Sequence, residues 1–210
     1  MEFGSAFVEF GRLLRERLTL GILTTEDTIR YTLYVALTTT GGLKHTDLTL
    51  EYPHPTLSGA KVDTVISAAA RRESAAFEFK YDRANPGGSN QNRTQRAAKA
   101  LIDLFRLVKV PAEVAAAKYF VYVTDREMAG YFRNQINRLH GLFDLTEGTE
   151  HALGPTSFQG YSRTLTTLVD PFASECVVTR VFAAELPADH CMRIFRVSAP
   201  PASTPDHRRL

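Results

Sequence analysis

The sequence predicts an α/β fold with a mixed central sheet of about four to five strands, flanked by helices and followed by an additional C-terminal β-hairpin. Two amphipathic helical segments come first, and three short alternating segments of strand type follow them. After these, strand and helix patterns alternate along the chain. We expect one domain over residues 1–198, with its core at about 24–140, and a disordered tail at 199–210.

The N-terminal part of the chain carries two helical patterns. Apolar residues at helical spacing from Phe7 to Leu18 predict the first helix. Thr24 is expected to cap the second helix, with Asp27 at its third position and Glu26 in its first turn. The residues expected to form the buried stripe of that helix are Ile29, Leu33, Val35, Ala36 and Leu37.

Three segments of alternating apolar and polar residues follow, at 48–52, 61–67 and 75–82. Pro53 and Pro55 end the first segment, and the polar residues 71–74 separate the second from the third. Short connections favour pairing between neighbours, so we expect an antiparallel meander.

The second half of the chain reads as a loop, two helices and three strands. Residues 85–90 carry a strong loop signal, and the apolar spacing from Ala97 to Val108 predicts a helix. The aromatic run 118–124 predicts a central strand, after which Asp125 is expected to cap a helix reaching Leu139. The segment 141–171 gives no clear pattern, whereas 175–186 and 191–197 predict the two strands of the hairpin.

Composition limits the class of protein. The chain of 210 residues has no apolar run near the 18 or so residues of a membrane span, and no signal-peptide pattern at its start, which indicates a cytoplasmic protein without a membrane partner. Cys176 and Cys191 are too few for a disulfide framework and lack zinc-site spacing, so we expect buried, reduced thiols. The formal net charge of +2 means that nucleic-acid binding would depend on local clusters of basic residues.

Acidic and basic side chains are predicted to meet on neighbouring strands. Because side chains alternate along a strand, Glu78 and Lys80 share one face, away from Phe77 and Phe79. Adjacent strands lie about 4.8 Å apart, so Asp63 can converge with Glu78 when the register allows it. Two carboxylates, completed by water and phosphate oxygens, are enough to bind Mg²⁺, with Mn²⁺ as a substitute. Lys80 would then position or help deprotonate the attacking water and stabilise charge on a phosphate.

The order of these elements resembles the PD-(D/E)XK nuclease superfamily, which has the restriction-endonuclease-like fold. The likeness covers residues 26–124 or so, about half the chain. In that superfamily an acid in the first core helix, an acid in the second strand and a Glu-x-Lys in the third form the metal site. The resemblance therefore implies metal ligands at Glu26, Asp63 and Glu78, with Lys80 as the catalytic lysine.

Two positions depart from that pattern or leave an alternative open. The proline that often precedes the strand acid is replaced by Val62. Asp27 is an alternative to Glu26, although its expected capping role competes with metal binding.

The helix after the glycine-rich loop begins with basic and amide residues. Helical spacing predicts that Arg93, Arg96 and Lys99 lie along one side, where they would bind phosphates. The resemblance implies a glutamine near the site on this helix, for which Gln95 is the first candidate and Gln91 the second. A DNA path along the hairpin, at Arg180, Arg193 and Arg196, is the alternative.

These observations favour a Mg²⁺-dependent endonuclease cutting DNA, in restriction or phage defence, recombination or repair. A homodimer, formed through the N-terminal helix or the hairpin, would allow both strands to be cut, and a protein partner is a further expectation. Two other classes stay open. One is a nucleic-acid-binding module without cleavage, using the basic residues already named together with Arg71 and Arg72; the other is an α/β interaction domain whose strand acids are simply solvated.

Overall fold

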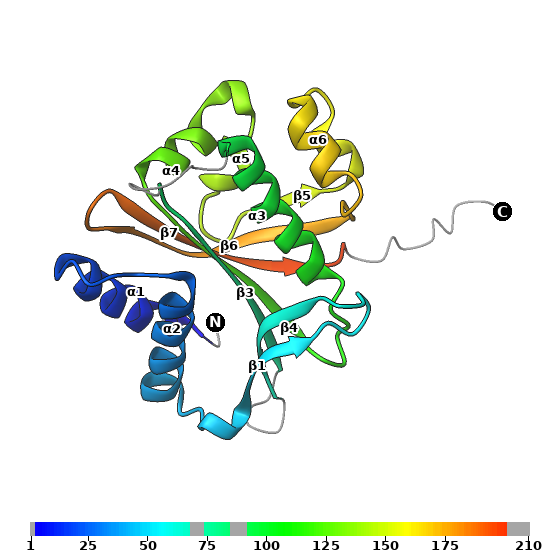
Figure 1. Cartoon of the computed structure of the whole chain (residues 1–210). Coiled ribbons are helices and arrows are strands. Elements are labelled where there is room, and N and C mark those ends of the chain that lie inside the picture. The colour runs from blue at the N-terminus through cyan, green and yellow to red at the C-terminus, as the bar shows by residue number, and fades with distance from the viewer. Residues whose placement is uncertain (1–2, 68–73, 85–91, 201–210) are drawn as a thin grey trace.

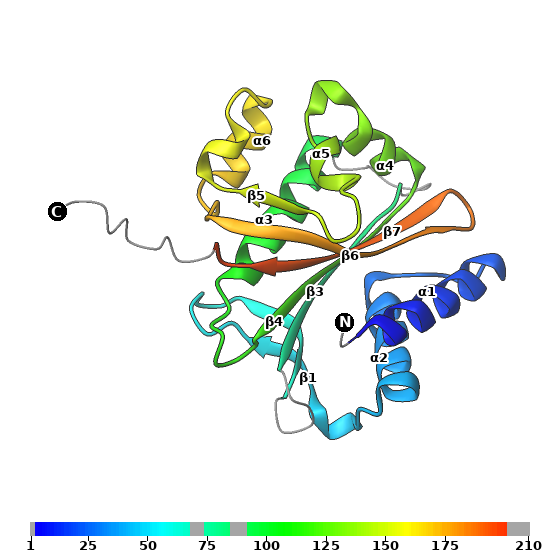
Figure 2. The same ribbon diagram turned by 180° about the vertical axis from the view of Figure 1, so that it is seen from behind.

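A computed structural model describes residues 3–67, 74–84 and 92–200. In these residues the chain forms an open, mixed sheet of seven strands in the order β1-β2-β3-β4-β7-β6-β5, with helices on both faces (Figures 1 and 2). The helices and strands are α1 (Gly4–Thr19), α2 (Glu26–Gly41), β1 (Leu48–Pro53), β2 (Lys61–Ile66), β3 (Ala75–Asp82), α3 (Arg93–Val108), β4 (Ala117–Thr124), α4 (Arg126–Arg133), α5 (His140–Phe143), β5 (Glu150–Leu153), α6 (Arg163–Val169), β6 (Cys176–Leu186) and β7 (His190–Ser198).

The first half of the sheet has the predicted topology. β1, β2 and β3 form an antiparallel meander, and β4 returns parallel to β3 after the crossover through α3. The α/β class and the mixed sheet are thus confirmed.

The expected size of the sheet was wrong. The hairpin of β6 and β7 is not an appendage, because β7 pairs antiparallel with β4 along its length and continues the central sheet. β5, from the segment without a clear pattern, pairs with β6 and forms the far edge. Pairing between β4 and β7 joins segments about 70 residues apart, and local patterns do not report such contacts.

Two apolar layers cover the sheet. α1 and α2 pack on one face, where Phe7 and Phe10 meet Phe77 and Tyr119 of the strands. α3 to α6 pack on the other face, against residues such as Phe120. Side chains of β3 alternate between the two layers, as its sequence predicted, so Phe77 and Phe79 lie toward α1 and α2.

The start of α2 differs from the prediction. Thr25, not Thr24, is the N-cap, and its hydroxyl accepts a hydrogen bond from the backbone N–H of Thr28 while the Thr28 hydroxyl accepts one from Thr25 N–H. Glu26 is consequently the first helical residue. Ile29, Leu33, Ala36 and Leu37 are buried as expected, whereas the expected burial of Val35 was wrong.

The helix after β4 is shorter than expected. Asp125 caps α4 by accepting a hydrogen bond from Met128 N–H, as predicted, but α4 ends at Arg133. Ile136, expected on the packing face, is exposed in a short 3₁₀ turn.

Cys176 and Cys191 are buried free thiols, as expected. Within the described residues, no helix combines the length and the apolar character needed to cross a membrane. Residues 201–210 of the expected tail lie outside the described residues.

Candidate functional site

The candidate site lies where β2 and β3 part. The two strands pair from Ile66↔Ala75 to Thr64↔Phe77, and the same register places Asp63 opposite Glu78. Beyond this point β3 has no β2 partner. The Phe79 N–H is bonded by a side chain instead, since Asp63 Oδ2 accepts from it at 2.8 Å. The parting of the strands thus leaves space in which side-chain carboxylates take the place of backbone acceptors.

Glu26 occupies the next position along the same edge. Its Oε2 atom accepts a hydrogen bond of 3.0 Å from the Tyr81 N–H, two residues beyond Phe79. The N-terminus of α2 is therefore fixed against β3, and Glu26 and Asp63 lie along one side of that strand. Asp27, the alternative to Glu26, is mostly exposed and lies 3.7 Å from Arg30.

Glu78 is buried beside a second carboxyl group. Only 7% of it is exposed. Burial raises the pKa of Glu78 to about 10, and the charges of Asp63 and Asp103 and a hydrogen bond with Asp63 add to this rise. The carboxyl groups of Asp63 and Glu78 therefore converge, as the strand register required. At neutral pH and without a cation, Glu78 holds a proton.

Lys80 lies between two acids. Its ammonium nitrogen is 3.6 Å from Glu26 Oε2 and 3.7 Å from Asp103 Oδ2. Burial lowers the pKa of Lys80, but the nearby Glu26, Asp103 and Asp82 carboxylates more than offset this, and the pKa is raised overall. Lys80 therefore keeps its positive charge at neutral pH.

Asp103 of α3 is a site residue that the sequence reasoning missed. It pairs with Lys80 and lies 3.6 Å from Arg106. Burial raises the pKa of Asp103 to about 6, while Lys80 and Arg106 oppose the rise. A signal was present: Gln95, Lys99 and Asp103 follow one another at intervals of four residues, so a helix presents all three on one side.

Arg30 and Glu51 complete the surroundings of Asp63. Arg30 Nη2 lies 2.6 Å from Asp63 Oδ1, and Arg30 Nη1 lies 2.7 Å from Glu51 Oε1. The β1–β2 register, with Leu50↔Thr64 and Tyr52↔Val62, leaves Glu51 opposite Asp63. Glu51 has a φ of 53°, a left-handed conformation that side chains other than glycine rarely adopt.

The acids suit a hard divalent cation in their chemistry. Among the described residues, no group of three or more His, Cys, Asp or Glu side chains is placed to hold a metal ion. Asp63 and Glu78 form a pair, and a Mg²⁺ ion that keeps several waters needs no more than one or two protein carboxylates. A cation between them would favour the ionised form of Glu78, against the burial and the neighbouring acids that raise its pKa.

The basic start of α3 is only partly as expected. Arg93, Gln95 and Lys99 are exposed, and Arg93 makes a long ion pair of 3.8 Å with Glu127. The expectation that Arg96 lies beside them for phosphate binding was wrong, because Arg96 is buried against Asp82 at 3.4 Å. Gln91, Arg71 and Arg72 lie outside the described residues.

The alternative DNA path along the hairpin loses one of its arginines. Arg193 is buried, with Nη2 2.7 Å from Glu185 Oε1. Its guanidinium also lies over the ring of Phe143. Arg193 is therefore part of the packing between β7 and α5.

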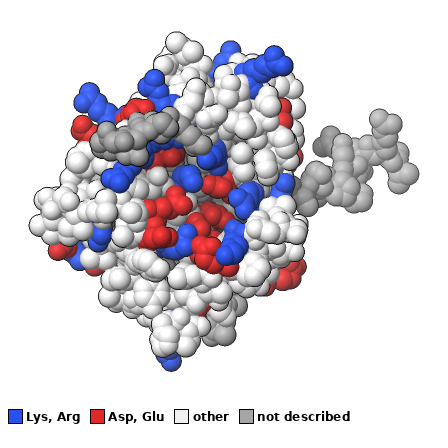
Figure 3. All heavy atoms as spheres, in the orientation of Figure 1, with Lys and Arg blue, Asp and Glu red and all other residues white. Residues whose placement is uncertain are grey.

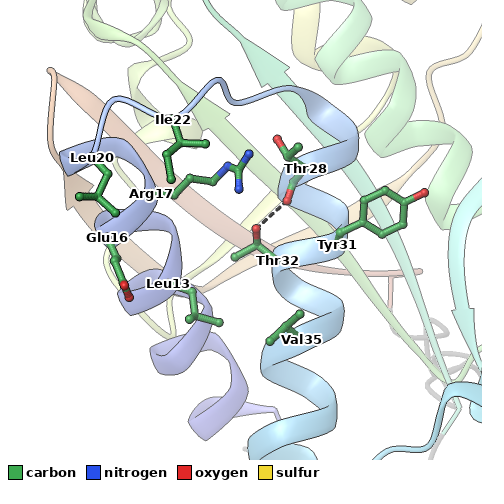
Figure 4. A pocket seen from close by; sticks show the side chains of 9 residues that line it. All are labelled: Leu13, Glu16, Arg17, Leu20, Ile22, Thr28, Tyr31, Thr32 and Val35. Carbon is green, nitrogen blue, oxygen red and sulfur yellow. Dashed lines mark hydrogen bonds between the residues drawn. The ribbon is translucent and has the colours of Figure 1, made fainter.

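A separate groove of about 360 Å³ lies between α1 and α2 (Figure 4). Leu13 of α1 and Val35 of α2 lie between the two helices, and the groove is also lined by Tyr31 of α2 and by Leu20 and Ile22 of the connecting segment. Its character is mainly apolar, so the groove has the chemistry of a contact surface and not of a hydrolytic site.

Acidic and basic side chains gather in the middle of the face that Figure 1 presents, between α2 and α3 (Figure 3). The candidate site therefore consists of a buried pair of acids, Asp63 and Glu78, and the nearby Lys80, at the point where β2 and β3 separate. Comparisons with protein-family models, curated proteins and solved structures gave no match.

Proposed function

We propose that this protein is a Mg²⁺-dependent DNA endonuclease of the PD-(D/E)XK type. The observation that carries the proposal is the meeting of Asp63 and Glu78 across the β2–β3 fork, with Lys80 on the same face of β3. The order of helix, meander, crossover helix and parallel strand supports it. Both features come from residues 26–124, the segment on which the resemblance rests.

Asp63 and Glu78 are the proposed ligands of the ion, whereas Glu26, which bonds the Tyr81 N–H and pairs with Lys80, forms no three-acid metal group with them in the described residues. The ion would polarise the scissile phosphate and lower the pKa of a water molecule. The protein's own contribution is to hold these acids rigidly. Asp63 is fixed by the Phe79 N–H and by Arg30, and Glu26 by the Tyr81 N–H, so little rearrangement is needed when substrate arrives.

Lys80 acts as a charged donor and not as a base. Its raised pKa leaves no lone pair at neutral pH with which to accept a proton from water. An ammonium held between Glu26 and Asp103 can orient a water molecule and stabilise negative charge that develops on the phosphate. Of the two roles expected for Lys80, the structure thus favours positioning over deprotonation.

DNA would approach the exposed start of α3, which carries Arg93, Gln95 and Lys99. These residues precede Asp103 on the same helix, so phosphates bound there lie next to the acids. Cleavage of both strands would require a two-fold dimer. We propose the apolar groove between α1 and α2 as the dimer contact. The opposite side of α1 is buried against the sheet and is not accessible to a second chain.

A plasmid-nicking assay tests the activity. The protein should nick or linearise DNA with Mg²⁺ or Mn²⁺, and EDTA should stop the reaction. Glu78→Gln should reduce the rate at least about 100-fold, because a ligand of the ion is lost. Glu113→Gln, which changes an exposed acid after α3, is the matched control and should cleave as the unchanged protein does. Cleavage in EDTA, or full activity of Glu78→Gln, would contradict the proposal.

A non-catalytic nucleic-acid-binding module is the second candidate. One observation favours it: Arg30 and Lys80 already provide positive charge beside Asp63, Glu26 and Asp103 without an ion. DNA binding that persists in EDTA and in Glu78→Gln, with no cleavage under any metal, would identify this function.

A further inference from the structure

We propose that the Arg30 guanidinium takes the place of a second metal ion, so that the site binds a single divalent cation. The inference rests on the proposed function and goes beyond it, because nucleases of this chemistry use either one ion or two. Paired ions lie about 3.5–4 Å apart and act on the attacking and leaving oxygens. To lie so close they share a carboxylate, each ion binding one of its two oxygens.

Asp63 would be the shared carboxylate, since it lies between Glu78 on one side and Glu51 on the other. Its two oxygens differ in their surroundings. Oδ2 accepts from the Phe79 N–H on the side of β3, where Glu78 also lies. Oδ1 accepts from Arg30 Nη2 at 2.6 Å, a short, charge-assisted hydrogen bond. One oxygen of Asp63 thus lies on the side of Glu78, the other proposed ligand, and the second oxygen already binds a cation of the protein.

Arg30 is held in this position by more than Asp63. Its Nη1 atom bonds Glu51 at 2.7 Å and lies 3.7 Å from Asp27, and only 12% of its side chain is exposed. Moving the Arg30 guanidinium away from Asp63 would therefore break several ion pairs at once. A guanidinium also keeps its charge at every pH at which a protein folds, so its repulsion of a second divalent ion is permanent.

The backbone of Glu51 gives independent support. A glutamate with φ of 53° within a strand is strained, and such strain persists where surrounding contacts impose it. Here it occurs at the residue of β1 opposite Asp63, and the Glu51 carboxylate binds Arg30 and, at 3.5 Å, Lys61. Glu51, the strained residue, is thus the one that binds the Arg30 guanidinium. In a two-ion site the Glu51 carboxylate would instead be a further ligand for a metal.

The number of bound ions tests the inference directly. Titration calorimetry with Mn²⁺ on the whole chain should give one ion per chain, and Arg30→Gln should raise this to two. Arg30→Lys keeps a positive charge and should remain at one. Arg12→Gln is the matched control, because Arg12 is also paired with two acids, Glu9 and Glu16, but on the exposed side of α1. It should remain at one.

The outcomes separate this inference from the proposed function. Two ions in the unchanged protein, with metal-dependent cleavage, overturn the inference and leave the function standing. No bound Mn²⁺ and no cleavage overturn both. One ion in a folded Arg30→Gln shows that Arg30 does not limit the site. Should that variant fail to fold, the electron paramagnetic resonance spectrum of the unchanged protein decides: an isolated Mn²⁺ ion supports the inference, and a coupled pair overturns it.

Discussion

Two buried charged clusters, one around Asp82 and one around Glu78, lie on the same face of β3, and they differ in how the charge of the acid is balanced. Asp82 accepts hydrogen bonds from the Tyr122 hydroxyl at 2.9 Å and from Arg96 at 3.4 Å, so that acid has its own cation and a neutral donor. Four residues earlier, Glu78 meets the acid Asp63. Both carboxyl groups are almost fully buried. Burial alone therefore does not single out Glu78 as the candidate functional acid, whereas the imbalance of charge around it does.

The pKa shifts express the same difference. Burial raises the pKa of Asp82, while Tyr122 and Arg96 counteract the rise. Burial also raises the pKa of Glu78, but there the neighbouring acids push it further, to about 10. The charge of Asp82 is thus balanced by a cation of the protein, whereas the acids around Glu78 would be balanced only by an added cation.

The largest expected effect is a difference in the free energy of unfolding between variants of Asp82 and Glu78. Asp82→Asn should lower the free energy of unfolding by about 3–5 kcal/mol, because the charge of Arg96 stays buried without a counter-charge. Glu78→Gln should lower it little or raise it, because Gln resembles the protonated carboxyl group and the chain no longer has to take up a proton on folding. Urea unfolding in EDTA at pH 7 measures both variants. Similar losses in the two would remove the distinction between the clusters.

Lys80 should affect chemistry much more than metal binding. Lys80→Met is expected to reduce the cleavage rate by about 10²–10³-fold, because it removes a fixed charge that stabilises the transition state. The affinity for Mn²⁺ should change far less, since an ammonium does not ligate the ion. Cleavage rates beside calorimetric titrations measure the two quantities, and equal losses in both would assign Lys80 to holding the acids in place.

The two clusters should also differ in their response to pH. The pKa of Glu78 is about 10 in the folded protein against an ordinary value of 4.5, so the folded state binds more protons than the unfolded state between these values. The metal-free stability should therefore decrease as pH rises through that range, and Glu78→Gln should flatten the decrease. Thermal melts in EDTA from pH 5 to 9 measure this; the same slope in Glu78→Gln would contradict it.

The same protonation predicts how metal binding depends on pH. Glu78 must lose its proton before it can ligate an ion, so Mn²⁺ binding at pH 7 should release about one proton per site. Calorimetry in two buffers of different ionisation enthalpy gives that number. Release close to zero would mean that Glu78 is already ionised.

The smallest effect is expected at the exposed start of α3. Arg93→Ala combined with Lys99→Ala should weaken DNA binding equally for all sequences, and the salt dependence should become shallower by roughly one to two units. Fluorescence anisotropy in Ca²⁺, over a range of salt concentrations, measures both. An unchanged slope would place the DNA path elsewhere on the molecule.

The sequence predicted β3 well because two local signals agreed there. The aromatic alternation around Glu78 fixed which face each side chain takes, and the short connection fixed the antiparallel pairing with the strand of Asp63. Glu26 was also located, since one helical turn defines its position at the start of α2.

Other parts depend on contacts that local patterns do not encode. Arg96 has the spacing of a surface residue, and only the packing of α3 on the sheet turns it toward Asp82. Asp103 lies among the apolar residues of α3, where the spacing of Leu101 and Leu104 dominates the pattern. Glu51, with its left-handed backbone, binds Arg30, which lies 21 residues earlier in the chain.

The insertion of β7 beside β4 has a consequence for how the chain folds. Every residue of the proposed site lies between Glu26 and Asp103, so the site can assemble during synthesis before residues 176–198 have been made. Until then β4 presents an open, strongly apolar edge, which is a template for pairing with other chains. Docking of the C-terminal hairpin closes that edge. A chain cut before residue 176 should therefore retain every side chain of the proposed site and yet aggregate, because the edge of β4 that β7 covers would stay open.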